Sequence, residues 1–231
     1  MQFAAPLLIA PVARWCVWET RLSQDGSIST PDVSFVEPML RRRLSSLTRM
    51  TLRVAYDCAH DITNVRFVYA SRHGELVRTT AMLEALAGKD ELSPAVFSMS
   101  VLNASTGLFS MLEKNVAPST AISAGRSSFG YGLLEACMQL KDHPDQSVLF
   151  VYADEPVPSV YGAEELTGSR AHAVGLLLQS SAETHVRCSL STGNAIRGDE
   201  VQSRAFLRSL ENGEADWCDG DQTWFWKKEC R

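Results

Sequence analysis

The residues that could act as nucleophiles lie in one strand, turn and helix pattern. A short apolar strand is predicted at residues 119–124, Gly125 permits a sharp turn, and apolar side chains at helical spacing continue to residue 140. The free backbone N–H groups and positive dipole at such a helix start lower the pKa of a thiol and stabilise an oxyanion. A serine or cysteine at this turn would therefore support acyl transfer.

The turn does not carry either nucleophile in the required setting. A serine hydrolase needs G-x-S-x-G, and neither Ser127 nor Ser128 has glycine two positions away on both sides. Cys137, the nearest cysteine, lies about three turns along the helix on its apolar stripe. Because cysteine is often buried, we expect Cys137 to belong to the core and not to act as a nucleophile.

Composition predicts one globular domain over residues 1–231, with residues 191–231 forming a C-terminal helix and a tail of uncertain role. Of the 231 residues, 45 % are hydrophobic and 21 % are charged, which is ordinary globular usage. The net charge of −5 provides no basic field for nucleic acid. No apolar stretch reaches the roughly 20 residues of a membrane span, so we expect a cytoplasmic protein that binds no membrane.

The six cysteines predict neither a metal site nor a disulfide framework. They form no C-x-x-C pair, and no histidine lies near them at the spacing of zinc ligands. We therefore expect reduced and mostly buried thiols, with no metal and no cofactor.

Hydrophobic patterning predicts alternating strands and helices that would position the turn. Helices are predicted at residues 40–58, 76–86, 97–112, 129–140 and 200–210. Strands are predicted at residues 65–70, 119–124, 148–153, 173–179 and 186–190, with one or two more within residues 1–20. The helix at 97–112 is rich in small residues, and we expect it to be buried. The order predicts a single α/β domain with a mixed central sheet.

Several short motifs occur in a characteristic order and spacing. They are Leu92-Ser93-Pro94, Asn103, Gly107, Pro118-Ser119, the strand and helix that follow, and the run at residues 148–155 that ends in Asp154 and Glu155. With them, roughly residues 38 to 190 resemble the N-terminal half of the β-ketoacyl synthases, which have the thiolase fold. The resemblance implies half of a thiolase-like fold, with helices covering a mixed sheet, and without the second half of a full ketosynthase.

The resemblance places Arg126 where these enzymes carry their acyl-accepting cysteine. A condensing synthase also needs two histidines, which the family supplies from glycine-flanked motifs in its second half. None of the five histidines here has glycine-rich surroundings, and we expect each to be structural: His60, His73, His143, His172 and His185. The expected protein is therefore a catalytically silent homologue with no catalytic residues.

The chain is similar to the chain length factors, the inactive partners of ketosynthases in type II polyketide systems, and most similar to the short forms of bacterial aryl polyene clusters. The resemblance implies a heterodimer with a full-length ketosynthase, which itself reacts with acyl carrier protein substrates. The residues expected at the partner interface and acyl tunnel are Val96, Phe97, Asn103, Ser119, Thr120, Ala121, Ile122, Ser123, Ala124 and Phe129. In the thiolase fold the strand at 119–124 lies at the dimer edge, and alone it would be an exposed apolar edge.

Other interpretations stay open from the sequence. Val96, Phe97 and Phe129 fit ordinary core positions equally well. Arg126 is expected either to point to solvent or to meet a carboxylate such as Asp154 or Glu155. Residues 41–43 form a run of arginines that fits a solvated helix face better than a docking site for an acidic carrier protein.

Two alternatives to a tunnel-shaping subunit remain. One is a small acyl transferase or malonyl decarboxylase of thiolase ancestry that uses Ser127 or Ser128. The other is a structural subunit that only solubilises its ketosynthase. We also expect the C-terminal helix and the tryptophans of the tail, Trp217, Trp224 and Trp226, to cover the face that the missing half would bury.

Overall fold

The computed structural model describes residues 6–21, 28–162, 170–193, 196 and 198–230. These residues form one eight-stranded sheet in the order β3-β2-β4-β5-β1-β6-β8-β7. The strands are β1 (Leu8–Glu19), β2 (Arg66–Ala70), β3 (Ser119–Ile122), β4 (Val148–Asp154), β5 (His172–Leu178), β6 (Thr184–Thr192), β7 (Glu214–Cys218) and β8 (Gln222–Cys230). β2 pairs in parallel with β3 and β4, and the other described pairs are antiparallel. The mixed central sheet expected from the sequence is confirmed.

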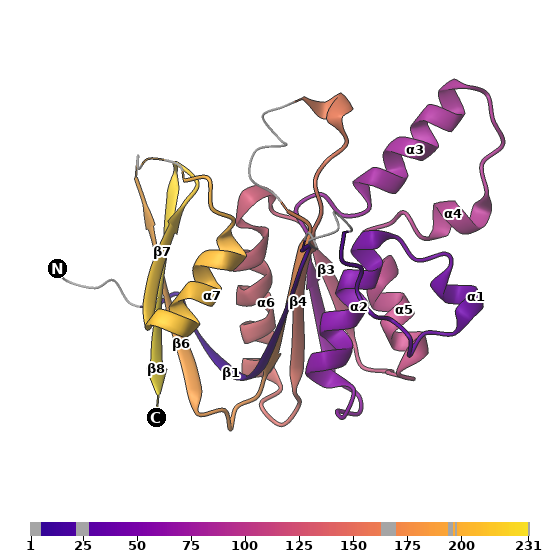
Figure 1. Ribbon diagram of the computed structural model, residues 1–231. Coiled ribbons are helices and arrows are strands. Elements are labelled where there is room, and N and C mark those ends of the chain that lie inside the picture. The colour runs from indigo at the N-terminus through magenta and orange to yellow at the C-terminus, as the bar shows by residue number, and fades with distance from the viewer. Residues whose placement is uncertain (1–5, 22–27, 163–169, 194–195, 197, 231) are drawn as a thin grey trace.

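Helices cover both faces of the sheet (Figure 1). The helices are α1 (Pro38–Arg41), α2 (Ser46–Ala59), α3 (Leu76–Ala87), α4 (Pro94–Ser98), α5 (Ala104–Leu112), α6 (Ser128–Asp142) and α7 (Gln202–Asn212). α2 and α5 pack on one face, and α6 and α7 lie on the other, where the C-terminal strands curve around them (Figure 1). Every residue of β4 and of β5 is buried, because both strands are continuous apolar runs covered on two sides.

Two predicted helices are each interrupted in the structure. The segment predicted as a helix at 40–58 contains α2 only from Ser46, because Ser45 ends the preceding loop and its side chain accepts a hydrogen bond from Thr48 N. The segment at 97–112 divides into α4 and α5, with a break between Ser98 and Ala104. The prediction of one buried helix there is wrong, since no residue of α4 is buried.

α3 and α4 form an arm that stands away from the sheet at the upper right of Figure 1. Only Thr80 of α3 is buried, although most of the helix is apolar. Leu83 and Leu86 on α3, and Val96 and Phe97 on α4, are exposed. A helix that is apolar on several sides ordinarily lies inside a protein, so this arm presents unusual apolar surface.

The tail for which no element was predicted forms two strands. β7 and β8 pair with each other, and β8 continues the sheet beside β6. Trp217, Trp224 and Trp226 are buried against α6 and α7, as part of the hydrophobic cluster on that face. α7 and the tryptophans thus cover one face of the domain, and the expectation that the missing half would bury this same face stays a prediction.

The described cysteines are unpaired thiols. Cys58, Cys137 and Cys188 are buried, while Cys16 and Cys218 are partly buried. Cys137 lies in the core as expected, and burial raises the pKa of its thiol to about 12. Within the described ranges no group of three potential ligand side chains could hold a metal ion, and no helix is both long and apolar enough to span a membrane.

Candidate functional site

The strand, turn and helix expected to mount a nucleophile are present. β3 ends at Ile122, Gly125 adopts a φ of 58°, and a 3₁₀ turn at Gly125–Ser127 leads into α6. A positive φ explains why glycine stands at this point, because a side chain there would be strained. Ser128 Oγ donates to Gly125 O at 2.7 Å and accepts from Ala124 N at 2.8 Å, which closes the turn.

Neither residue at the apex of this elbow has a thiol or a hydroxyl group. Its left-handed residue is Gly125, and the next residue is Arg126. The two serines that follow are committed to structural hydrogen bonds: Ser128 closes the turn, and Ser127 Oγ donates to Asp219 Oδ2 at 3.0 Å. No hydrogen bond between either serine and a histidine is present among the described contacts.

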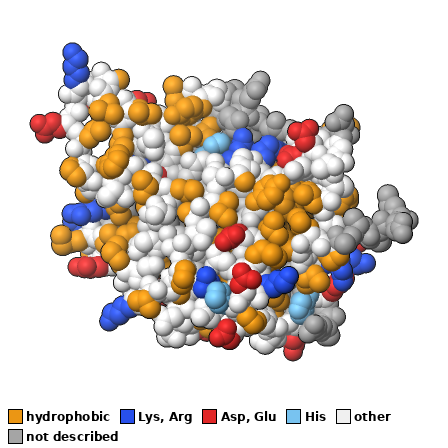
Figure 2. Space-filling model, turned by 180° about the vertical axis from the view of Figure 1, so that it is seen from behind, with side chains coloured by type: hydrophobic (Ala, Val, Ile, Leu, Met, Phe, Trp, Pro, Cys, Tyr) orange, Lys and Arg blue, Asp and Glu red, His pale blue; other side chains and the backbone are white. Residues whose placement is uncertain are grey.

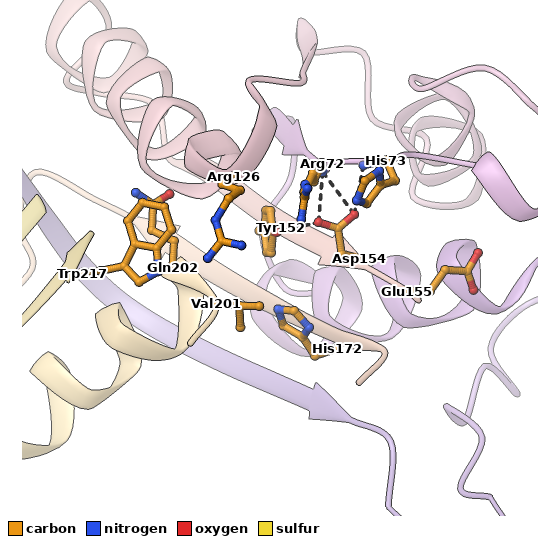
Figure 3. A pocket seen from close by; sticks show the side chains of 10 residues that line it. All are labelled: Arg72, His73, Arg126, Tyr152, Asp154, Glu155, His172, Val201, Gln202 and Trp217. Carbon is orange, nitrogen blue, oxygen red and sulfur yellow. Dashed lines mark hydrogen bonds between the residues drawn. The ribbon is translucent and has the colours of Figure 1, made fainter. Parts of the chain in front are cut away.

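A small cavity opens beside the elbow (Figure 3). Its volume is about 40 Å³, and its walls come from the elbow, the ends of β2 and β4, the start of β5, and the C-terminal segment. Arg126, Asp154 and His172 face it from three of these elements (Figure 3). Such a volume holds an ion or about one water molecule and is far below that of a usual ligand pocket.

Asp154 anchors the turn that follows β2. Its buried carboxylate accepts hydrogen bonds from Ser71 Oγ at 2.8 Å, from Arg72 N at 3.0 Å, and from His73 N at 3.2 Å. The hydroxyl of Tyr152 donates to the same carboxylate at 2.5 Å. Because the turn leads directly into α3, Asp154 fixes the base of the exposed arm.

Glu155 and His172 differ from ordinary surface groups. Burial, together with the charges of Glu75 and Asp154, raises the pKa of Glu155 to about 7. Burial lowers the pKa of His172, which favours the neutral ring. His172 Nδ1 donates to Arg170 O at 3.0 Å, and Nε2 accepts from Ser203 Oγ at 2.9 Å. Both nitrogens therefore serve structural bonds, consistent with the expectation for His172.

Arg126 contacts the C-terminal segment. Its Nη2 donates to Gly198 O at 2.8 Å, and its guanidinium carbon lies 5.8 Å from the centre of the Trp217 ring. Arg126 shares the cavity with Asp154 and Glu155, but the described contacts of these residues do not include the expected ion pair, which stays a prediction.

The C-terminal segment also closes the start of α6. Gly130 N, near the first turn of the helix, donates to Gln202 Oε1 of α7 at 2.7 Å. The ring of Trp224 lies so close that a Cβ on Gly130 would stand 2.7 Å from it. The N–H of Gly130, near the start of α6, is therefore engaged by another part of the chain. The sequence offered no signal for Gln202 or Asp219, which lie far from the elbow in sequence.

The residues expected at the partner interface fall into two groups. β3 is an edge strand, and its outer edge is unpaired within the described chain. The residues that are exposed or only partly buried, on that edge or on the arm and the start of α5, are Val96, Phe97, Asn103, Ser119, Thr120, Ala121, Ile122, Ser123 and Ala124. Phe129 is different, because it is fully buried among Phe150, Tyr152, Phe206 and Trp226. The assignment of Phe129 to an interface or tunnel therefore has no support from its position.

A groove adjoins this surface. It lies between α1, α4 and α5 and has a volume of about 610 Å³. Small or apolar side chains such as Ala95, Ala104 and Met111 line it, and Arg43 stands at its margin. Hydrophobic side chains gather on this part of the surface, at the left of Figure 2.

Comparisons with known proteins agree with this architecture. Residues 15–227 match the family described as β-ketoacyl synthase, N-terminal domain. No curated protein sequence matches the chain. A chain in the structure of the ketosynthase ApeO in complex with its chain length factor ApeC, from Xenorhabdus doucetiae, is 25 % identical with a TM-score of 0.81. The match covers 95 % of this chain and 99 % of that chain, so the two have similar lengths.

Two further structures are similar in fold. A chain of the ishigamide ketosynthase/chain length factor has a TM-score of 0.60 at 12 % identity, over 89 % of this chain and 72 % of that one. A chain of AntDE:AntF, a type II polyketide acyl carrier protein in complex with its ketosynthase, has a TM-score of 0.54 at 13 % identity, over 82 % and 70 %. The expected half of a thiolase-like α/β fold is confirmed. Since the family match extends over most of the sequence, this chain belongs to the family of β-ketoacyl synthase N-terminal domains.

Proposed function

We propose that this chain is a non-catalytic chain length factor. It forms a heterodimer with a full-length β-ketoacyl synthase and shapes the acyl tunnel of that enzyme, in type II polyketide (aryl polyene) or fatty-acid-like biosynthesis. The observation that carries the proposal is an elbow without a nucleophile, closed by the chain's own C-terminal segment, next to an open apolar edge.

Catalytic silence is supported by what occupies the elbow. The positions at the turn are Gly125 and Arg126, neither of which can form an acyl ester or thioester. Gln202 takes up the N–H of Gly130, and Trp217 lies over the guanidinium of Arg126. A substrate carbonyl would therefore meet no nucleophile at the apex of the turn, and the N–H of Gly130 is already engaged.

Pairing with a partner is supported by the surface on the β3 side. An unpaired apolar edge strand attracts another strand, and proteins ordinarily cover such edges. Phe97 is 60 % exposed and Val96 is 39 % exposed, on the arm next to this edge. A large partner that extends the sheet beyond β3 would cover both the edge and the arm.

The relatives support the identity of that partner. The structure with 25 % identity is described as a ketosynthase with its chain length factor, and the matched chain is as short as this one. By this likeness the acyl carrier protein would deliver its substrates to the ketosynthase and not to this chain. The cytoplasmic location expected from the sequence remains a prediction.

The first test is co-expression with a full-length ketosynthase encoded beside the gene. We expect the two chains to co-purify in equal amounts and the product length to depend on this chain. Phe97→Ala removes a large exposed side chain from the arm, and Phe225→Ala is the matched control, since Phe225 is 47 % exposed on β8 at the opposite end of the sheet.

The outcomes separate the interpretations. Phe97→Ala or Val96→Phe should change product length with condensation retained, while Phe225→Ala should change nothing. If the variants on the arm co-purify normally and leave product length unchanged, this chain only solubilises its partner. If no complex with a ketosynthase forms, the proposal fails.

The second test addresses catalysis directly. Incubation of the isolated chain with radiolabelled malonyl carrier protein should give no stable label and no carbon dioxide. Arg126→Cys should also stay inactive, because Gln202 still takes up the N–H of Gly130 and the described contacts include no hydrogen bond between a histidine and the elbow. Labelling at Ser127 or Ser128 would favour the alternative, a small acyl transferase or malonyl decarboxylase.

A further inference from the structure

Two thiols lie together where β1 crosses α2, on the face of the sheet opposite α6. Cys58 near the end of α2 is fully buried, and Cys16 on β1 is partly buried against the same hydrophobic cluster. Neither residue takes part in the elbow or in the surface on the β3 side. Their proximity is unexplained by the proposed function.

The sheet register brings the two side chains toward each other. Cys16 lies directly opposite Gly175 in the antiparallel pair of β1 and β5. A Cβ on Gly175 would stand 3.0 Å from Cys58 Sγ and 2.9 Å from Val54 O of α2. Directly opposite residues project from the same face of a sheet. The side chain of Cys16 therefore projects toward α2, next to the point where α2 packs directly on Gly175 and places Cys58 Sγ against it.

The surroundings differentiate the two thiols. A hydrogen bond from Cys58 and the nearby charge of Arg14 lower the pKa of Cys16, against the effect of burial. The same interaction, together with burial, raises the pKa of Cys58. Arg14 is held in place, since Nη1 donates to Cys58 O at 2.9 Å and to Asp61 at 2.8 Å. Cys16 is thus the more accessible and more acidic thiol, with a protected thiol beside it.

We propose that Cys16 and Cys58 form a reversible oxidation site that reacts with hydroperoxides and closes to a disulfide. The Cys16 thiolate attacks a peroxide oxygen, the O–O bond breaks, and the leaving oxygen takes up a proton to give an alcohol or water. Cys16 is then a sulfenic acid. The sulfur of Cys58 attacks it, the S–O bond breaks, and the hydroxide leaves as water with the Cys58 proton.

The peroxide is the oxidant in this reaction. The two thiols give up two electrons, which reduce the O–O bond, and a thiol reductant restores both cysteines. The resulting disulfide would link the end of α2 to β1 across the face of the sheet. This covalent link should raise the midpoint of unfolding, because it restricts the unfolded chain.

The remaining described thiols provide internal controls. Cys137 and Cys188 are both buried on the other face, and burial raises the pKa of each to about 12. Cys218 is partly buried and has no described thiol beside it. Cys16 and Cys218 are both partly buried, so accessibility alone would expose both to oxidation, whereas the proposal favours Cys16.

The test is oxidation of the full, reduced chain with hydrogen peroxide, followed by peptide mapping without reductant. We expect a peptide that links Cys16 to Cys58 and lacks two hydrogen atoms, and that disappears after dithiothreitol. Cys16→Ser should abolish the link, and Cys58→Ser should leave a sulfenic acid on Cys16 that dimedone traps. Cys188→Ser should leave the link intact.

The proposal is overturned if Cys218 is oxidised before Cys16, or if the oxidised chain contains no Cys16–Cys58 peptide. The result is independent of the proposed function, because the test uses the isolated chain and requires no ketosynthase. Should Cys58→Ser fail to fold, Cys16→Ser at the partly buried position still decides the outcome.

Discussion

The contact of α6 with the C-terminal strands can be tested at one glycine. A Cβ added at Gly130 would lie 2.7 Å from the Trp224 ring and 2.9 Å from Gln202 Nε2. Trp224 cannot move away easily, since it is fully buried and its ring centre lies 5.2 Å from Tyr131 and 6.1 Å from Trp226. Gly130→Ala therefore forces the C-terminal segment away from the start of α6.

The expected loss of stability follows from two opposing terms. Overpacking a core of this kind costs about 1–3 kcal/mol, and the lack of space places this site near the upper value. Alanine is better than glycine inside a helix by about 1 kcal/mol. We expect the free energy of unfolding to fall by about 2 kcal/mol, which corresponds to a drop in Tm of about 4–8 °C for a chain of this size.

Gly107→Ala is the matched control. Gly107 lies within α5, and a Cβ there would meet no atom within 4 Å. The same substitution should therefore raise the free energy of unfolding by up to about 1 kcal/mol. Urea unfolding of both variants, followed by tryptophan fluorescence, measures the difference. If Gly130→Ala is as stable as Gly107→Ala, the close packing of Trp224 on α6 is refuted.

Three other substitutions give separate predictions. Asp154→Asn replaces one acceptor oxygen of the side chain by an NH2 donor, so hydrogen bonds from the turn at Ser71–His73 are lost. Urea unfolding should show that the free energy of unfolding falls by about 3 kcal/mol. The pKa of Glu155 is raised from 4.5 to about 7, so the folded chain binds more protons than the unfolded chain between these values and loses stability as pH rises through them. Glu155→Gln should remove this slope in Tm against pH, and an unchanged slope would contradict it. Ser45→Ala removes the cap of α2 and should cost about 1 kcal/mol in thermal unfolding.

Much of the sheet was predictable because its strands are covered on both faces by this chain. The runs at β4 and β5 contain apolar side chains without interruption, and the structure buries all of them. The tail was not predicted, because Phe225 between Trp224 and Trp226 hides the alternation of a strand. Trp224 and Trp226 are buried whereas Phe225 is 47 % exposed. Burial therefore alternates along the strand, but all three residues are aromatic, so the sequence does not show this alternation.

The arm shows a limit of hydrophobic periodicity. An apolar pattern indicates a face that avoids water, but it does not say which chain covers that face. Val96 and Phe97 were consistent with a buried helix, and the structure exposes both. Phe129 was consistent with a tunnel, and the structure places it in the core. The exposed apolar residues Val96 and Phe97 and the buried Phe129 can be told apart only once the structure shows that α4 lies beyond the edge of the sheet.

The same limit explains why the elbow was predictable and its closure was not. Residues 119–140 are continuous in sequence, so strand, glycine and helix follow from local patterns. Gln202, Trp217 and Asp219 reach the elbow because α7 packs beside α6 and β7 joins the sheet through β8. Contacts between distant segments of this kind leave no local signal.

The C-terminal segment covers one apolar face of the sheet and leaves the other apolar surface open to a partner. In a domain that lacks a second half, the outer face of α6 would be an apolar surface available to any partner. Here Trp224, Trp226 and α7 bury that face, and Gly130 allows the tryptophan to approach. The apolar surface that the described chain leaves next to an unpaired strand is at β3, α4 and α5. Because α7 and the tryptophans cover the face at α6 while the surface at β3, α4 and α5 stays open, we expect a large partner at the β3 edge, and the segment that covers α6 also supplies Gln202 and Trp217 to the elbow.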